Sequence, residues 1–183
     1  MNINTKKDYF EIQKAIKFLT EKLLDHNGDQ IPLHTDKPLV IHSLRTGFIL
    51  LDYGYEKDIV IAGILHDLNE DAEVSFSEIE KLFGNKVRKI VQAVSYDRTI
   101  ENDRLGHQDL HDREKAAGQK AIVVSIADHL ANFPFLKYAA TLELQKKILK
   151  RWQTFLNKVA VAACEEPIFR ELKKKLLSVR LDI

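Results

Sequence analysis

The chain has 183 residues, 45% of them hydrophobic and 30% charged, a composition typical of a globular domain. Lys and Arg number 28 against 27 Asp and Glu, so the net charge is +1, whereas a general binder of nucleic acid or acidic membranes carries a basic excess. A single cysteine, Cys164, excludes an internal disulfide and a cysteine-rich zinc site.

The apolar residues mostly recur at three- and four-residue spacing, and only 7 Gly and 4 Pro interrupt the chain. This periodicity predicts helices and no sheet. Two helices are expected first, at residues 8–25 and 39–53, with a polar loop at 26–38 between them. A third segment is apolar throughout residues 59–65 and turns polar at 66–71, which predicts a buried helix whose polar end opens into the interior or a cleft.

The fourth predicted helix has the clearest start signal in the chain, since Ser75 and Glu78 form a capping box. Gly84 stands where a helix commonly ends, and a fifth helix follows at about residues 87–94. Residues 95–112 are polar and predict an irregular segment, which at that length is more often a functional loop than a mere connection.

A sixth helix over residues 121–132 is mostly apolar and therefore buried, and two amphipathic helices follow it, the second starting near Pro167. The chain is thus predicted to form one all-α domain over residues 1–183, a helical bundle. Its core is expected at about residues 26–137, and two additional C-terminal helices at about 138–183.

The chain carries no sign of export or of membrane insertion. No uninterrupted apolar run reaches the ~18 residues of a membrane span, and no apolar segment follows the basic pair Lys6 and Lys7 as in a signal peptide. Together with the single cysteine, these features predict a cytoplasmic protein that binds neither membrane nor nucleic acid.

Two imidazoles and two carboxylates interrupt helices that are otherwise apolar: His42, His66, Asp67 and Asp128. Burying a carboxylate costs several kcal/mol unless it is paired or bound to a metal ion. Consecutive helical residues point about 100° apart, so His66 and Asp67 can both face one ion that lies between them. Mixed nitrogen and oxygen ligands favour Mn, Fe, Co or Zn over Ca, so the four residues predict a divalent transition-metal site.

A further carboxylate and an amide stand one helical turn from these predicted ligands. Glu70 lies four residues after His66, on the same helix face, where a carboxylate can act as general base for an attacking water. Asn132 follows Asp128 by four residues, so an amide that can hold a substrate shares a face with a metal ligand. The predicted chemistry is metal-assisted hydrolysis of a phosphorylated molecule.

The pattern resembles the HD-domain superfamily of metal-dependent phosphohydrolases, and most closely the guanosine tetraphosphate (ppGpp) hydrolases of Rel/Spo proteins and small alarmone hydrolases. The resemblance runs over about residues 26–136. Four residues match the metal ligands of the family: His42, His66, Asp67 and Asp128. The family's catalytic Glu-Asp pair falls on Glu70 and Asp71, and its substrate-binding Asn falls on Asn132.

The resemblance implies a fold, a metal ion and a reaction. The implied fold is an HD-domain helical bundle, and the implied ion is Mn²⁺ or another divalent transition metal. In that family, water attack on the 3′-diphosphate of ppGpp releases pyrophosphate and leaves GDP or GTP. Applied to this chain, it implies a ppGpp 3′-pyrophosphohydrolase-like enzyme that binds a nucleotide and uses Glu70 as general base.

The chain departs from the family pattern around the substrate. Family members carry, before the first His, an Arg that packs on the guanine base, and residues 26–38 contain no Arg. His34 and Lys37 are the two candidates to take over a contact there, and Lys37 is the one that we include among the substrate contacts. Tyr96 stands after the fifth helix, where family members contact the substrate, and His129 stands where the family has Arg.

Basic and reactive residues outside these motifs have two readings each. Four cations either grip substrate phosphates or form a solvated face: Arg98, Arg104, Arg113 and Lys120. His107 and His111 bind a second metal if their segment is helical, and are otherwise loop histidines without ligand duty. Cys164 is interpreted as a buried small apolar residue.

Three functions remain open from the sequence alone. The first is hydrolysis of ppGpp or a close relative, which the complete set of metal-ligating and catalytic residues favours. The second keeps the metal chemistry and changes the substrate to another nucleotide, which the missing Arg favours. The third is a non-catalytic binding module on an HD scaffold, which the same complete set disfavours.

Overall fold

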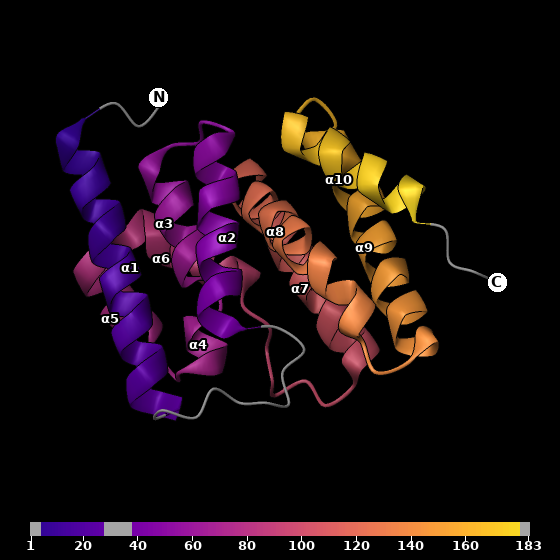
Figure 1. The fold of residues 1–183 in the computed structure, drawn as a ribbon, viewed down its shortest axis with the longest axis horizontal. Helices are drawn as coiled ribbons and strands as arrows, with labels where there is room; N and C mark the ends of the chain where they lie inside the picture. The colour runs from indigo at the N-terminus through magenta and orange to yellow at the C-terminus, as the bar shows by residue number, and fades with distance from the viewer. Residues whose placement is uncertain (1–4, 28–37, 180–183) are drawn as a thin grey trace.

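The computed structural model describes residues 5–27 and 38–179 of the chain, and its regular structure is entirely helical there. The helices, in chain order, are α1 (Lys6–Asn27), α2 (Leu39–Asp52), α3 (Lys57–Leu65), α4 (Leu68–Asp71), α5 (Phe76–Phe83), α6 (Asn85–Val94), α7 (Asp103–Ala117), α8 (Gln119–Asn132), the 3-10 helix η1 (Phe133–Tyr138), α9 (Leu142–Ala163) and α10 (Pro167–Ser178). The all-α prediction is confirmed (Figure 1). None of the described helices is both long and apolar enough to span a bilayer.

The centre of the bundle is formed by the two helices that the sequence predicts to be buried, α3 and α8. Every residue from Ile59 to Leu65 of α3 is buried, and so is every residue from Ala121 to Ala127 of α8. Helix α2 packs against both of them, α1 covers α3 at one edge, and α9 and α10 cover α8 at the other (Figure 1). The burial of these two segments follows from their apolar sequence.

Two glycines allow α2 and α3 to approach closely. A Cβ at Gly47 would lie 2.3 Å from Ile64 Cγ1, and a Cβ at Gly63 would lie 2.4 Å from Leu50 Cδ1. Any larger residue at either position would push the helices apart, because buried apolar side chains have no space to move into. The close approach matters because α2 carries His42 and the end of α3 leads into His66.

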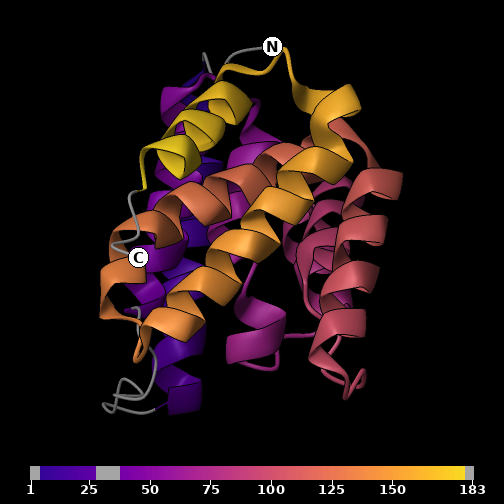
Figure 2. The ribbon, with the colours of Figure 1, turned by 90° about the vertical axis from the view of Figure 1, so that its right-hand side faces the viewer.

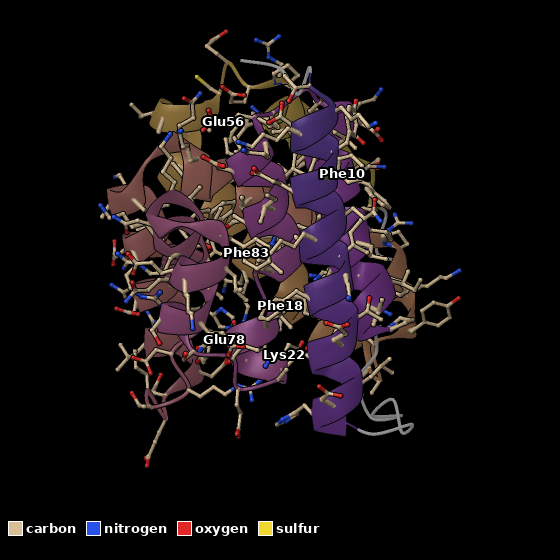
Figure 3. The ribbon with its side chains drawn as sticks, turned by 90° about the vertical axis from the view of Figure 1, so that its left-hand side faces the viewer. Phe10, Phe18, Lys22, Glu56, Glu78 and Phe83 are labelled. Atoms are coloured by element: carbon tan, nitrogen blue, oxygen red, sulfur yellow. The ribbon has the colours of Figure 1, made fainter. Side chains whose placement is uncertain are left out.

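Helix α1 also fixes the position of α5, as Figure 3 shows. The rings of Phe18 and Phe83 meet edge to face, with centroids 5.5 Å apart. Lys22 Nζ lies 2.9 Å from Glu78 Oε1 at the start of α5. The predicted start of α5 is confirmed, since Ser75 Oγ accepts a hydrogen bond from the Glu78 amide at 3.2 Å.

The prediction of an irregular segment at residues 95–112 is wrong for most of its length. Helix α7 begins at Asp103, and the Asn102 side chain caps it by accepting from the Leu105 amide at 3.1 Å. The helix has no apolar stripe because it buries mainly Gly106, His111 and Glu114, so hydrophobic periodicity cannot reveal it. His111 is therefore buried in a helix and is not a solvated loop residue.

Helices α9 and α10 are the two predicted C-terminal helices, and α9 runs beside both α7 and α8 (Figure 2). Its Trp152 and Phe155 are buried, as the amphipathic pattern predicts. The prediction that Cys164 is buried is wrong, because α9 ends one residue before it and leaves its side chain exposed. Tyr55 Oη donates to Glu166 Oε2 at 2.5 Å and ties the start of α10 to the loop after α2.

We expect Tyr55→Phe to loosen the attachment of α10. The substitution removes one hydrogen bond to a carboxylate, which Gln119 continues to contact, so the loss in the free energy of unfolding is about 1 kcal/mol. Urea unfolding measures it, with Tyr9→Phe on the exposed face of α1 as the matched control. An unchanged unfolding midpoint in Tyr55→Phe would mean that this contact does not hold α10.

Candidate metal centre

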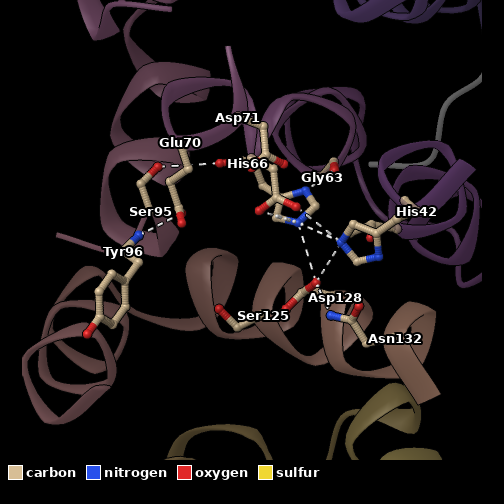
Figure 4. A network of polar contacts seen from close by, with 12 residues as sticks. His42, Gly63, His66, Glu70, Asp71, Ser95, Tyr96, Ser125, Asp128 and Asn132 are labelled. Carbon is tan, nitrogen blue, oxygen red and sulfur yellow. Dashed lines mark hydrogen bonds and ion pairs between the residues drawn. The ribbon is translucent and has the colours of Figure 1, made fainter. Parts of the chain in front are cut away.

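Three separate segments bring the four predicted ligands to one place in the bundle. His42 comes from the second turn of α2, His66 and Asp67 form the turn between α3 and α4, and Asp128 lies in the last turns of α8. Figure 4 shows the imidazoles of His42 and His66 facing the carboxylate of Asp128. The sequence motifs are thus adjacent in space, although their roles as ligands stay a prediction.

The donor atoms converge closely. His42 Nε2 lies 2.9 Å from Asp128 Oδ1 and 3.3 Å from Asp67 Oδ2. His66 Nε2 lies 3.1 Å from Asp67 Oδ1 and 3.4 Å from Asp128 Oδ1, and the two Nε2 atoms are 3.2 Å apart. His42, His66 and Asp128 each offer one ligand atom within 4.8 Å of the others, so these three alone can hold an ion.

The hydrogen bonding of His66 leaves the correct nitrogen for a metal. Its Nδ1 lies 2.8 Å from the carbonyl oxygen of Gly63, and a carbonyl only accepts, so Nδ1 carries the proton. The neutral ring then presents a lone pair at Nε2 toward the other donors, which is the arrangement typical of metal-ligating histidines. Two imidazole nitrogens and two carboxylates fit a divalent transition-metal ion.

The charged groups of the cluster shift one another's pKa values. Burial works to lower the pKa of His66, but the carboxylates of Asp67 and Asp128 outweigh it and raise that pKa well above its ordinary value. Burial works to raise the pKa of Asp128, but contacts from His129 and His42 keep it well below its ordinary value. Because ligands must be deprotonated to bind a metal, an ion bound by these residues would release protons, and its affinity would fall as the pH falls.

The i,i+4 relation between His66 and Glu70 assumes one unbroken helix, but the polar residues after His66 do not continue α3. Helix α3 ends at Leu65, and a new short helix begins at Leu68, with the Asp71 amide bonded to the Asp67 carbonyl at 2.8 Å. Glu70 therefore turns toward the end of α6, where Glu70 Oε1 accepts from the Tyr96 amide at 2.8 Å (Figure 4). It still lines one cleft of about 350 Å³ together with His66, Asp67 and Asp128.

Glu70 is held in a state suited to proton transfer near neutral pH. Burial raises its pKa, the nearby charge of Asp67 raises it further, and the amide of Tyr96 opposes both, which leaves a pKa of about 7. A general base works best when its pKa lies near the working pH. The position of Glu70 in the cleft and its pKa both suit the predicted role.

Of the predicted substrate contacts, Tyr96 lines this cleft, whereas Asn132 and Arg98 each line another pocket. Asn132 Nδ2 donates to Asp128 Oδ1 at 2.8 Å, so this amide also orients a predicted ligand. The Tyr96 ring lies against His107, with centroids 5.1 Å apart. Arg98 Nη2 lies 3.6 Å from Asp71 Oδ1. The predicted contact by Lys37 lies outside the described residues.

Two of the other cations have structural partners. Arg113 donates to the carbonyls of Gln92 and Ser95 at 3.0 and 2.8 Å, which fixes the segment before α7. Lys120, on the first turn of α8 and two turns before Asp128, pairs with Glu56. These contacts indicate that Arg113 and Lys120 hold the fold together rather than bind substrate phosphates. Arg104, in contrast, lines an open pocket between α7 and α9.

Helices α7 and α9 also line the site, which the hydrophobic periodicity does not predict. A cavity of about 300 Å³ borders Asp128 and Asn132 and is also lined by His107, His111 and Trp152. Within the part of the chain that the structure describes, His107 and His111 belong to no cluster able to hold an ion. The i,i+4 spacing of the two histidines was the available signal, and it indicates a shared helix face.

Glu114 is a buried carboxyl group behind the site. It is 2% exposed, Oε1 accepts from Ser125 Oγ at 2.6 Å, and Oε2 has no hydrogen-bond partner among the described residues. Burial raises its pKa from 4.5 to about 8, and the charge of Asp128 contributes to the rise. Glu114 is therefore mostly protonated in the folded protein at neutral pH.

We expect Glu114 to make stability fall as the pH rises. The folded-state pKa lies above the unfolded value, so the folded protein binds the extra proton between pH 4.5 and about 8. The free energy of unfolding then decreases across this window, by up to about 1.4 kcal/mol per pH unit. Glu114→Gln imitates the protonated acid and should make the decrease smaller by the contribution of Glu114, while the exposed Glu101→Gln leaves the decrease as in wild type. Urea unfolding across the pH range decides, and equal slopes in wild type and Glu114→Gln would contradict the assignment.

Comparisons with known proteins agree with this geometry. A family model described as "HD domain" matches residues 19–161. The guanosine-3′,5′-bis(diphosphate) 3′-pyrophosphohydrolase of Aquifex aeolicus is 30% identical over 142 residues, which cover 76% of this chain and 20% of that protein. The guanosine-3′,5′-bis(diphosphate) 3′-pyrophosphohydrolase MESH1 of Xenopus tropicalis is 34% identical over 131 residues, 69% of each chain.

The fold also has a solved counterpart. A structure described as "A metazoan ortholog of SpoT hydrolyzes ppGpp and plays a role in starvation responses" matches with a TM-score of 0.75 and 19% identity. The match covers 96% of this chain and 98% of that one, and it demonstrates the likeness of fold. In contrast, the chain spans only about a fifth of the length of long relatives such as the Aquifex protein.

Proposed function

Because this chain belongs to the HD-domain family of metal-dependent phosphohydrolases, we propose that it hydrolyses guanosine-3′,5′-bis(diphosphate) to GDP and pyrophosphate. The observation that carries the proposal is the meeting of two imidazoles and two carboxylates next to a cleft that Glu70 lines together with His66, Asp67 and Asp128. The names of the relatives at 30% and 34% identity supply the substrate. The single exposed cysteine is compatible with action in the cytoplasm, which we also propose.

Four residues would hold the metal ion, which we propose to be Mn²⁺: His42, His66, Asp67 and Asp128. A bound divalent ion lowers the pKa of water and polarises a phosphoryl oxygen. The chain supplies the geometry for this chemistry. Gly63 holds the His66 ring through Nδ1, and Asn132 holds Asp128 through Oδ1, so both ligands are oriented before an ion arrives.

Glu70 would take the proton from the attacking water. The Tyr96 amide donates to Oε1 and fixes the carboxylate, which leaves the proton to be accepted at Oε2. A pKa of about 7 means that the carboxylate is available as a base at neutral pH and still accepts a proton readily. We assign Asp71 a supporting catalytic role, in which its carboxylate holds the guanidinium of Arg98, a proposed substrate contact.

Arg98, Tyr96 and Asn132 are the proposed substrate contacts among the described residues. The guanidinium of Arg98 suits a phosphate group, and its side chain is 65% exposed and lines a pocket together with Glu70 and Tyr96. Asn132 borders the cavity next to Asp128, where the rest of the nucleotide has space to bind. Lys37 completes the proposed set from outside the described residues.

A second candidate is hydrolysis of another nucleotide by the same centre, since residues 26–38 lack an Arg to pack on guanine. A substrate panel with Mn²⁺ separates the two: ppGpp, GTP, GDP, ATP and nucleoside monophosphates. We expect pyrophosphate from ppGpp and little turnover of the others. Turnover of another nucleotide without turnover of ppGpp would replace the proposed substrate and keep the metal chemistry.

A further inference from the structure

Asp128 is held at both carboxylate oxygens by residues of its own helix. Asn132 Nδ2 donates to Oδ1 at 2.8 Å, and His129 Nδ1 lies 3.3 Å from Oδ2. A carboxylate only accepts, so the contact with His129 places the imidazole proton on Nδ1. Oδ1 is also the oxygen that faces His42 and His66, so His129 holds the oxygen that points away from them.

The ring of His129 is itself clamped by α9. It stacks on the indole of Trp152, with centroids 5.3 Å apart and planes 21° apart. Phe155 meets it edge to face at 4.9 Å, and Trp152 continues the stack onto Phe133 at 6.1 Å. Trp152 and Phe155 are buried, so the His129 ring cannot turn away without opening the packing between α8 and α9.

We propose that His129 is a positioning residue for Asp128, and that α9 sets the metal affinity of the centre through the stack of Trp152 on His129. The inference rests on the proposed metal centre. Because Nδ1–H engages Oδ2, the carboxylate is fixed with Oδ1 toward the two imidazoles, and it does not lose rotational freedom when an ion binds. Outer partners of metal ligands typically contribute about 10- to 100-fold in metal affinity.

Two substitutions distinguish positioning from a purely structural role. The amide nitrogen of Asn reaches the place of Nδ1, so His129→Asn keeps the donor to Asp128. The amide of Gln reaches the place of Nε2 and moves the donor away from Oδ2. Gln is the better helix former, and His129 lies inside α8, so a structural role would favour Gln over Asn. Positioning favours Asn over Gln.

The test is the binding of Mn²⁺ alone, measured by calorimetry on the purified chain, with circular dichroism to confirm folding. We expect His129→Gln to bind about 10- to 100-fold more weakly than wild type, and His129→Asn, which keeps the donor but loses the stack on Trp152, to bind with an affinity between the two. Equal affinity of Gln and wild type, or an equal loss in Asn and Gln, would overturn the inference. Failure of the wild type to bind Mn²⁺ would instead overturn the proposed metal centre.

Trp152 gives the same test at a distance from the ligands. Trp152→Leu leaves the His129 side chain unaltered but removes the indole on which its ring stacks, whereas Trp152→Phe retains an aromatic ring there. We expect Mn²⁺ affinity to fall in Trp152→Leu and to stay near wild type in Trp152→Phe. Unchanged affinity in a folded Trp152→Leu variant would show that α9 does not act on the centre. This pair also decides the matter if His129→Gln does not fold.

Discussion

Replacing Glu70 by Gln is expected to lower kcat by about 10²- to 10⁴-fold, the range that a general base contributes. Gln keeps the shape of the side chain and an oxygen that accepts from the Tyr96 amide, but it cannot take a proton from water. Because Glu70 is not one of the four ligands, Mn²⁺ binding should persist. Steady-state kinetics on ppGpp and calorimetry with Mn²⁺ measure the two properties separately.

The pH profile gives an independent check on Glu70. The carboxylate must be deprotonated to act, so activity is lost as the pH falls below its pKa. That pKa is about 7 without an ion, and a bound cation can only lower it, so the ascending limb of kcat/KM should lie at or below pH 7. Exposed Glu101→Gln is the matched control. Wild-type turnover in Glu70→Gln would exclude Glu70 as the base.

Asp67→Ala is expected to weaken metal binding strongly and to abolish turnover. The Asp67 carboxylate contacts both imidazoles, with Oδ2 at 3.3 Å from His42 Nε2 and Oδ1 at 3.1 Å from His66 Nε2. Its loss would remove one proposed ligand and a negative charge, so Mn²⁺ affinity should fall by more than the about 10- to 100-fold that is typical of an outer partner. Calorimetry with Mn²⁺ and the ppGpp assay give the two readouts.

The helical content of Asp67→Ala should stay that of the wild type, because the residue lies in the turn between α3 and α4. Asp52→Ala, at the exposed end of α2, is the control for loss of a carboxylate elsewhere. A folded Asp67→Ala protein that binds Mn²⁺ as the wild type does would remove Asp67 from the ligand set. The centre would then consist of the three remaining residues.

The apolar helices and the convergence of the four polar residues could be predicted, because both depend on local pattern. A helix that is mostly apolar is buried, so both α3 and α8 are expected in the core. His42, His66 and Asp128 interrupt helices of that core, and burial forces such groups to find one another. The cluster is therefore a consequence of composition and periodicity together.

What could not be predicted depends on contacts between distant segments. Helix α7 lacks an apolar stripe because it buries a glycine, a histidine and a glutamic acid, and Gly106 is needed there since a Cβ would lie 2.1 Å from Tyr96 Oη. The break between α3 and α4 has no sequence signal, and it redirects Glu70 toward Tyr96. The stack of Trp152 on His129 arises only when α9 packs on α8.

The most direct measurement is the release of pyrophosphate and GDP from ppGpp by the purified chain with Mn²⁺, with Asp67→Ala measured alongside. A metal centre that hydrolyses the 3′-diphosphate predicts both products from the wild type and neither from the folded variant. Equal release by the two proteins would contradict the metal centre. No release from ppGpp by a wild type that binds Mn²⁺ would contradict the proposed substrate.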